Sequence, residues 1–355
     1  MAKVISVGTA DPPYKFPQNE VKDFVHRLFS GSYEYIERTI NVFDNSMIEI
    51  RHFTQPKEWA VETHGFRERN ELYVKDACIL SSEAVRNCIK EINADFSDFD
   101  HIIFVSSTGI STPSIDALLI NELKLNCHIR RTPIWGLGCV GGAVGLSRAF
   151  EYTSTYPNGA ALLIAVEICS LAFQRDDYSK SNIIATSLFS DGAAAAVVVG
   201  KEHKLFESTG ISFIDSLSTT FSNSVDVMGW KVVDTGFKVI FSKDIPTIVK
   251  KHIRPNITEL LQKHKLTLDD IKHFVTHPGG PKVISAYEES LGLPGGTLKF
   301  SRKVLREHGN MSSPSVLYVL DEFLRSREYN SEDYGLISAL GPGFSSEIIL
   351  FQVCS

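Results

Sequence analysis

The sequence has no run of basic residues, and this absence limits the partners that the protein can bind. Its 36 lysines and arginines are outnumbered by 42 aspartates and glutamates, which gives the 355-residue chain a formal net charge of −6 at pH 7. Affinity for the phosphates of DNA or RNA comes from dense lysine and arginine, so a nucleic-acid binder is excluded. Any anionic ligand needs a local pocket of its own.

Long hydrophobic runs are also missing. The longest ones, residues 160–166 and 193–199, are far below the roughly 18 residues that a membrane span needs. The N-terminal segment turns polar too soon to hold the apolar part of a signal peptide. We therefore expect a cytoplasmic protein without a membrane span.

Cysteines are few, and they do not follow the patterns of disulfide frameworks or zinc sites. No CxxC pair occurs, and no cysteines and histidines cluster at zinc-binding spacing. We therefore predict neither disulfides nor a metal site. We expect six free thiols, and the question is which one reacts: Cys78, Cys88, Cys127, Cys139, Cys169 or Cys354.

The overall composition is that of a globular protein. Apolar residues make up 43% and charged residues 22% of the chain, which excludes a disordered tail, a collagen or a coiled coil. A chain of this length buries roughly 75% of the surface that its extended form exposes. This is enough for one large core or for two ordinary domains.

Short β-branched runs alternate with longer segments of helical periodicity, and this alternation predicts an α/β layered architecture. Apolar residues at helical spacing predict helices over 71–92, 244–263 and 313–325. The strand candidates are 3–7, 101–106, 161–166, 193–199, 210–217, 274–276, 334–339 and 347–353.

One stretch of the first half is echoed in the second. SDFDHIIFVS at 97–106 resembles LDDIKHFVTH at 268–277: each passes an Asp-rich turn and enters a short apolar strand with a polar far end. The following strands also echo one another. We predict two duplicated α/β halves, 1–205 and 206–355, that meet near 200–213. The alternative is that short apolar strands look alike by chance.

The strongest local feature is WGLGCVGGAVGL at 135–146, in which five glycines surround Cys139. Glycines remove side-chain bulk, so backbone and ligand can approach the sulfur closely. A helix that starts just beyond Cys139 would place unpaired amides at the thiol and lower its pKa. Cys139 is therefore a candidate nucleophile. The alternative is a small buried cysteine at a tight strand-to-helix junction.

A nucleophilic thiol needs a proton acceptor, and the chain has 11 histidines. His277 ends a predicted strand and precedes PGGP at 278–281, a loop without bulky side chains, so its imidazole would face an open site. His101 and His273 lie at strand entries, where packing or solvation is their expected role. Asn310 precedes a predicted helix and offers a third polar group, although the ordinary role of such an Asn is a helix cap.

The glycine loops do not indicate nucleotide binding. Gly136 and Gly138 superficially resemble a dinucleotide-binding turn, but the usual acidic residue after a following strand is missing. No GxxxxGK[ST] motif occurs either. NAD and ATP are therefore excluded.

Four motifs taken together resemble one known family. GCVGG at 138–142, THPGGP at 276–281, GNMSS at 309–313 and GPGF at 341–344 are similar to the chalcone-synthase-like family, the type III polyketide synthases. The resemblance covers nearly the whole chain, with the motifs in family order and spacing. It implies the thiolase fold, with two duplicated α/β halves in a five-layered α-β-α-β-α arrangement, and a homodimer.

Within this family the sequence looks most like the bacterial long-chain alkylpyrone and alkylresorcinol synthases. The features that favour this branch are WGLGC at 135–139, VEICSL at 166–171 and SLFSDGA at 187–193. The resemblance implies condensation of an acyl-CoA starter, long-chain in this branch, with malonyl-CoA by decarboxylative Claisen condensation. Cyclisation would then give alkylpyrones and alkylresorcinols.

The resemblance also implies roles for three residues. Cys139 would receive the starter acyl group and hold the growing chain, and His277 would pair with its thiolate. With Asn310, His277 would hydrogen-bond the malonyl thioester carbonyl and stabilise the enolate left by decarboxylation. The substrates are coenzyme A thioesters, and no metal or organic cofactor is needed.

Further positions are implied as substrate-binding. Phe189 matches an aromatic gate between the coenzyme tunnel and the reaction cavity, and the second gating position falls at Val239, with Phe237 nearby. Of three basic positions that plant relatives direct at coenzyme A, only Arg38 remains, beside Asn41 and Asn45, so a carrier protein could deliver the starter. The other implied positions are Cys169, Ala172, Ser312, Gly279, Gly280 and Gly343.

Three other functions compete with this interpretation. Ketoacyl-carrier-protein synthase III shares the Cys, His and Asn but has His-Gln-Ala-Asn where this chain has HPGG at 277–280. A papain-like cysteine protease has the three residues in the same order, without the surroundings found at Cys139. An acyl-binding protein without catalysis is disfavoured by the intact triad.

Overall fold

Strands from both halves of the chain join in one sheet. Within the residues that the computed structural model describes, 2–30, 36–92, 94–242 and 244–354, nine strands pair in the order β11-β12-β13-β8-β1-β7-β6-β4-β5. Their bounds are β1 Ala2–Ala10, β4 His101–Val105, β5 Arg130–Ile134, β6 Ala160–Ile168, β7 Asp191–Gly200, β8 Gly210–Thr220, β11 Ile271–Thr276, β12 Tyr334–Gly341 and β13 Ser345–Cys354. The eight strands expected from the sequence are confirmed.

The strand pairing repeats between the two halves. In the first half β4 runs parallel to β6, β6 pairs antiparallel with β7, and β7 pairs antiparallel with β1. In the second half β11, β12, β13 and β8 pair in the same way. The two sets join where β1 pairs with β8 over a short stretch. The internal echo in the sequence therefore corresponds to a repeated sheet topology, and the division at residue 205 stays a prediction.

The turns before β4 and β11 also match. Each is a short 3-10 helix, Phe96–Asp98 and Leu268–Asp270, and each carries a capping box in which side chains satisfy the first backbone amides. The Asp-rich character of both turns follows from this capping.

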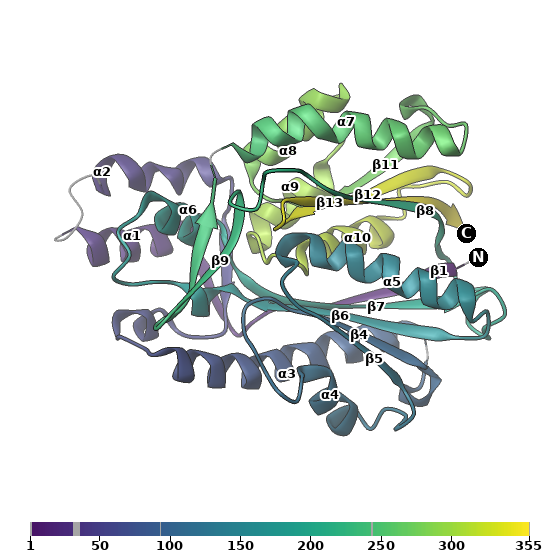
Figure 1. Ribbon diagram of the computed structural model, residues 1–355, viewed down its shortest axis with the longest axis horizontal. Helices are drawn as coiled ribbons and strands as arrows, with labels where there is room; N and C mark the ends of the chain where they lie inside the picture. The colour runs from purple at the N-terminus through teal and green to yellow at the C-terminus, as the bar shows by residue number, and fades with distance from the viewer. Residues whose placement is uncertain (1, 31–35, 93, 243, 355) are drawn as a thin grey trace.

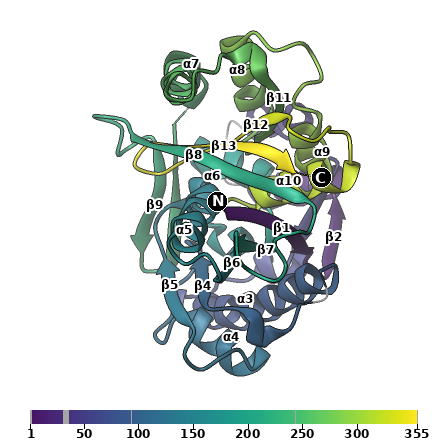
Figure 2. The same ribbon diagram turned by 90° about the vertical axis from the view of Figure 1, so that its right-hand side faces the viewer.

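Helices separate the two groups of strands and cover their outer faces. Figure 1 shows α5 and α10 between them, α3 and α4 below, and α7 and α8 above, and Figure 2 shows the same stacking after a quarter turn. This is the five-layered arrangement expected of the thiolase fold. The bounds are α1 Gln18–Phe29, α2 Ile36–Thr39, α3 Phe66–Lys90, α4 Ile115–Leu123, α5 Gly141–Thr155, α6 Lys180–Leu188, α7 Ile245–Lys263, α8 Pro281–Leu291, α9 Lys299–His308 and α10 Ser315–Ser326.

The central strands β6 and β7 are apolar throughout because both of their faces are covered. Alternate residues of β6 belong to different cores: Leu163 packs with α5 and α10, while Leu162 packs with α3 and α4. None of the helices formed by the described residues is long and apolar enough to cross a bilayer.

The sequence did not predict two small two-stranded sheets and one edge strand. The small sheets pair β2 with β3 (Tyr14–Pro17 and Ile50–Phe53), which are distant in the chain, and β9 with β10 (Met228–Val233 and Gly236–Phe241), which form a hairpin. The edge strand β5 has two arginines and a proline, a composition that only an edge tolerates. Both small sheets contribute to the cavities described next.

Candidate active site

Cys139 lies in the tight connection between β5 and α5. A 3-10 turn covers Gly138–Val140, and α5 begins immediately after it. A Cβ on Gly142 would lie 2.3 Å from the carbonyl oxygen of Ser313, and one on Gly138 would lie 2.8 Å from the ring of Pro342. These glycines therefore let neighbouring loops pack against the Cys139 turn. The sequence had indicated space for a ligand instead.

Cys139, His277 and Asn310 line one cavity. His277 follows the last residue of β11, and Asn310 lies in the connection between α9 and α10, so three distant parts of the chain meet here. The cavity spans about 330 Å³ of space, part of which is open to solvent, and we call it the cysteine cavity. Its lining consists of Cys139, Met228, Phe241, Ile245, His277, Gly279, Val283, Tyr287, Asn310 and Leu340.

Hydrogen bonds fix Asn310 on both its backbone and its side chain. Its backbone N–H donates to the Leu188 carbonyl at 2.8 Å, and its carbonyl accepts from the Ser190 N–H at 2.8 Å. Its Oδ1 accepts from the Ser312 N–H at 2.8 Å, while Nδ2 donates to the Gly279 carbonyl over 3.4 Å. Asn310 does not cap α10, which begins further along the chain. The weakly held Nδ2 is the part that can turn to a ligand.

The imidazole of His277 is buried and makes no hydrogen bond to the described residues. Its backbone N–H donates to the Ser338 carbonyl at 2.8 Å, but both ring nitrogens lack a partner. Burial lowers the pKa of His277 to about 3, because a charged ring would lose its hydration. At pH 7 the ring is therefore neutral and can accept a proton. His101 and His273, in contrast, bond to Thr132 and Asp333 away from the cavity.

The Cys139 thiol is buried and neutral at pH 7. Burial raises its pKa to about 12, and hydrogen bonds with Ser312 and Asn310 offset only part of this rise. The Sγ donates to the Ser312 Oγ at 3.4 Å, and the described residues show no hydrogen bond between Cys139 and His277. The predicted lowering of the thiol pKa by the start of α5 is therefore wrong for this state, because desolvation outweighs the helix.

A buried carboxyl group lies behind the thiol. Glu167 of β6 accepts hydrogen bonds from the Ser107 N–H and the Ser313 hydroxyl, both at 2.8 Å. Burial raises the pKa of Glu167 to about 7 against the effect of these bonds, and its charge disfavours a thiolate at Cys139. The sequence reasoning missed Glu167. Its one signal was an acidic residue inside an otherwise apolar strand.

A second, larger cavity is lined by Cys169, Ala172 and Phe189, as the resemblance implies. It holds about 850 Å³ of space, part of which is open to solvent, and we call it the apolar cavity. Most of its walls are aromatic and aliphatic side chains: Phe16, Val21, Phe24, Val25, Phe53, Pro56, Trp59, Ala60, Phe173, Ala185, Trp230 and Val239.

Two phenylalanine rings lie where the cavities adjoin. Phe189 lines the apolar cavity and Phe241 lines the cysteine cavity, and their rings meet edge to face with centroids 6.2 Å apart. At the predicted second gate, Val239 lines the apolar cavity and Phe237 packs against Phe66 at 5.3 Å. Trp230 of the apolar cavity also lies against Phe189, with ring centroids 6.4 Å apart. The sequence reasoning missed both Phe241 and Trp230. Alternation along β10 directs residues 237, 239 and 241 to the same side.

Of the other implied binding residues, some lie at the cysteine cavity and others line neither cavity. Ser312 contacts Cys139, and Gly279 lines the cysteine cavity. Gly280 lies just before α8 and has a φ of +144°. Among the described residues that line the two cavities, neither Gly280 nor Gly343 is found. Arg38 is exposed on α2, away from both linings, and Asn41 and Asn45 are exposed beyond it.

Comparison with known proteins gives matches over both halves of the chain. Residues 1–203 match the family model for the N-terminal domain of chalcone and stilbene synthases, and residues 214–354 match the model for the C-terminal domain. A putative chalcone synthase of Bacillus subtilis (strain 168) is 45% identical over 360 residues, which cover 99% of each chain.

Two further relatives share one activity by name. A 1,3,6,8-tetrahydroxynaphthalene synthase of Streptomyces peucetius subsp. caesius is 32% identical over 98% of this chain and 92% of its own. The solved structure of the synthase of that name from Streptomyces coelicolor A3(2), described as a bacterial type III polyketide synthase, superimposes with a TM-score of 0.94 at 28% identity. The match covers 99% of both chains.

Proposed function

Because the chain belongs to the chalcone and stilbene synthase family, we propose that it extends a long-chain acyl-CoA starter with malonyl-CoA and cyclises the product to alkylpyrones. At the coarser level it is a type III polyketide synthase, an acyl-transferring condensing enzyme. The proposal assigns catalysis to Cys139, His277 and Asn310, and assigns binding of the starter chain to the apolar cavity.

The single observation that carries the proposal is the apolar cavity beside the cysteine cavity. Cys169 and Ala172 are small side chains in a wall that is mostly aromatic and aliphatic, so most of the wall offers a long alkyl chain apolar contact. The polar side chains in the lining are Glu20, Arg51, Gln55, Lys57, Ser170, Asn182 and Thr186. Each methylene buried there contributes roughly 0.8 kcal/mol. A cavity of this kind favours long starters over acetyl-sized ones.

The loading step follows from the neutral thiol and the free imidazole. As Cys139 Sγ attacks the thioester carbonyl, His277 accepts the thiol proton. The tetrahedral adduct then collapses, coenzyme A leaves as a thiolate, and the His277 imidazolium returns the proton to it. Moving a proton from the thiol to the ring keeps the cavity neutral overall, and attraction between the two new charges offsets part of their desolvation.

The extension step uses the same cavity, but it needs no proton transfer from Cys139 to His277. The Asn310 Nδ2 and an N–H of His277 would donate to the malonyl thioester carbonyl. Loss of CO₂ leaves the bond's electron pair as an enolate, and the two donors stabilise the charge on its oxygen. The enolate carbon then attacks the acyl-Cys139 carbonyl, forming a carbon–carbon bond and releasing the Cys139 thiolate. This chemistry asks for no metal or organic cofactor.

A second candidate product comes from the relatives. Two of them are named tetrahydroxynaphthalene synthases, and a hydroxylated naphthalene can be assembled from malonyl-derived units alone. This product would need no alkyl starter, so the apolar cavity would hold the polyketide chain itself.

One incubation distinguishes the two. The purified protein receives malonyl-CoA alone, or together with acyl-CoA starters from acetyl to stearoyl, and mass spectrometry follows the products. We expect alkylpyrones, with some alkylresorcinols, whose yield rises with starter length, and little product from malonyl-CoA alone. Tetrahydroxynaphthalene from malonyl-CoA alone, unaffected by long starters, would contradict the starter assignment.

The donor of the starter and the oligomeric state of the protein need separate experiments. Replacing each acyl-CoA by the same acyl group on a carrier protein tests whether a carrier is the donor, since Arg38 is exposed away from both cavities. Sedimentation of the purified protein tests the homodimer that we propose. Neither of these experiments tests the roles of Cys139, His277 and Asn310.

A further inference from the structure

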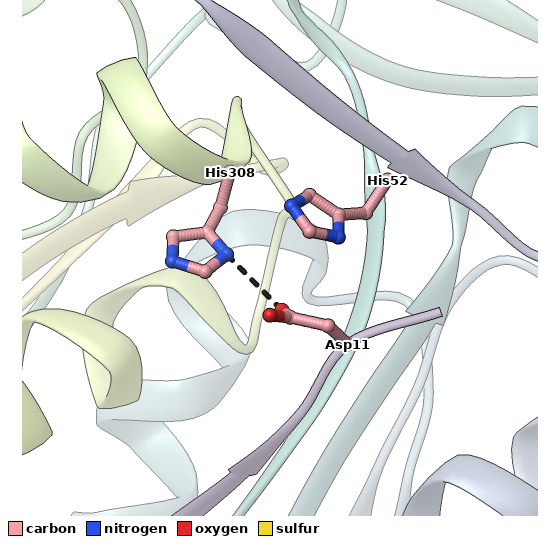
Figure 3. Close-up of side chains that lie close together, drawn as sticks. All are labelled: Asp11, His52 and His308. Atoms are coloured by element: carbon pink, nitrogen blue, oxygen red, sulfur yellow. Dashed lines mark hydrogen bonds and ion pairs between the residues drawn. The ribbon is translucent and has the colours of Figure 1, made fainter. Parts of the chain in front are cut away.

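Three side chains that the proposed reaction does not use converge outside both cavities. Asp11 follows β1, His52 lies in β3, and His308 is the last residue of α9. Each offers one ligand atom, and these three atoms lie within 4.8 Å of one another. Figure 3 shows the hydrogen bond between Asp11 and His308 with the His52 ring beside them, and the two imidazole rings are stacked with centroids 5.2 Å apart. Distances along the chain are too long for any sequence motif to reveal the group.

One imidazole nitrogen of the group is unused. The buried Nδ1 of His52 has no hydrogen-bond partner among the described residues. Asp11 Oδ1 and His308 Nδ1 already pair at 3.0 Å. Lys15 lies opposite His52 in the pairing of β2 with β3, and it is a nearby charge that opposes a cation.

Two imidazoles and one carboxylate are the ligand set of Zn²⁺ and similar first-row ions rather than of Mg²⁺ or Ca²⁺. Bonds of about 2.0–2.2 Å place the ligand atoms of a tetrahedral ion roughly 3.3 Å apart. His308 Nδ1 and Asp11 Oδ1 are already 3.0 Å apart, so rotation of His52 is the main adjustment. We propose that Asp11, His52 and His308 bind one divalent transition-metal ion, with Zn²⁺ as the expected occupant and a fourth position open to water.

The surroundings support the same assignment. The Tyr318 hydroxyl lies 2.9 Å from the Ala10 carbonyl and 3.1 Å from Asp11 Oδ1, and it can donate its proton to either oxygen. A hydrogen bond to Asp11 would be the outer contact that orients a ligating carboxylate. The Asp11 side chain is 40% exposed while His52 is buried, so an ion can enter from the Asp11 side.

A bound ion would tie β1 and β3 to the end of α9. His308 is two residues before Asn310, and the backbone N–H of His52 donates to Ser190, the residue after Phe189. The site is therefore structural: it anchors the segments that carry Asn310 and Phe189, and it takes no part in bond making. Because the ion binds the folded chain, it stabilises that state.

The test measures metal binding and not activity. Protein without a polyhistidine tag is stripped with EDTA, freed of the chelator, and titrated with Zn²⁺; bound zinc is measured by mass spectrometry after gel filtration. We expect one Zn²⁺ per chain and a higher unfolding temperature. Co²⁺ should give the intense visible absorption of a tetrahedral site.

Two variants and one control variant locate the ion. Asp11→Asn keeps the size and hydrogen bonding of the side chain, and it should lose stoichiometric zinc, the Co²⁺ absorption and the thermal shift. Tyr318→Phe should weaken zinc binding by about 10- to 100-fold. His128→Ala, which removes an exposed histidine next to exposed Cys127, should bind zinc like the wild type.

Three results would overturn the proposal. If the wild-type protein binds no zinc, then Asp11, His52 and His308 form only a hydrogen-bonded cluster. Asp11→Asn that binds zinc as tightly as the wild type would place the ion elsewhere. Loss of binding in His128→Ala with retention in Asp11→Asn would assign it to the exposed Cys127 and His128 pair.

Discussion

Cys139 and Cys169 are both buried cysteines, yet they lie in different cavities with different neighbours. Burial raises the pKa of both thiols, so acidity alone does not single out a nucleophile. Cys139 shares its cavity with His277, whose ring nitrogens are free. Cys169 faces the apolar cavity, and the charges of Glu167 and Asp191 disfavour its thiolate further. The presence of a neutral imidazole in the same cavity is the reason why we propose Cys139, and not Cys169, as the nucleophile.

The same contrast separates the two cavities. The cysteine cavity is small and is lined by the polar side chains of Cys139, His277 and Asn310, to which we assign catalysis. The apolar cavity is larger and is mostly lined by aromatic and aliphatic side chains, and we assign the starter chain to it. Substitutions in the first should change rates with every starter. Substitutions in the second should change which starter is used.

The largest effect is expected from removing the nucleophile. Cys139→Ala should lower product formation on the order of 10⁴-fold or more, because no other group can hold the acyl chain beside His277. Cys169→Ala is the matched control, since it removes a buried thiol from the neighbouring cavity, and it should retain most activity. Mass spectrometry measures the product formed per enzyme. Equal losses of product in the two variants would contradict the assignment of Cys139, and not Cys169, as the nucleophile.

Next in size is the loss of one enolate donor. Asn310→Ala should reduce malonyl decarboxylation by about 100- to 1000-fold, because a single donor then carries the developing charge. Acyl loading should fall much less, since His277 still accepts the thiol proton. Release of labelled CO₂ and the mass of the loaded enzyme give the two rates separately. Equal losses in both steps would argue for a structural role of Asn310.

A change in the apolar cavity should alter selectivity. Ala172→Phe fills space in the wall, so use of the longest starters should fall by about tenfold or more relative to short ones, while malonyl decarboxylation stays unchanged. Ala172→Gly, which adds no bulk, should keep the wild-type profile. An unchanged starter profile in Ala172→Phe would place the alkyl chain outside this cavity.

The smallest effect concerns pH. His277, with a pKa near 3, stays neutral through mild acid, so loading should persist at about pH 5, where a base of ordinary histidine pKa would be mostly protonated. As pH rises through about 7, Glu167 loses its proton and its charge opposes the forming thiolate, so loading should slow by about two- to fivefold. Glu167→Gln should remove this slowing. Loading that falls steeply below about pH 6.5 would contradict the low pKa of His277.

The sequence predicted the strands and helices that build the two cores, because buried segments carry a strong apolar pattern. It also selected Cys139, His277 and Asn310, which the fold brings into one cavity, and their catalytic roles stay predictions. The glycines at Gly138 and Gly142 were noticed for the wrong reason, since their role is close packing and not ligand access.

What the sequence did not predict depends on tertiary contacts. The direction of the Cys139 pKa depends on how fully the thiol is buried, which no local pattern records. Phe241 faces Phe189 only because β9 and β10 form a hairpin over the cavities. Asp11, His52 and His308 are far apart in the chain, so a search for metal-ligand spacing could not find them.

The central claim is that Cys139 is the residue that carries the acyl chain. Enzyme mixed with a long-chain acyl-CoA without malonyl-CoA, quenched in acid and digested with trypsin, gives the peptide 132–148 with Cys139 as its one cysteine and the peptide 149–175 with Cys169. We predict the acyl mass on 132–148 alone. An acyl group on 149–175, with 132–148 unmodified, would contradict the account.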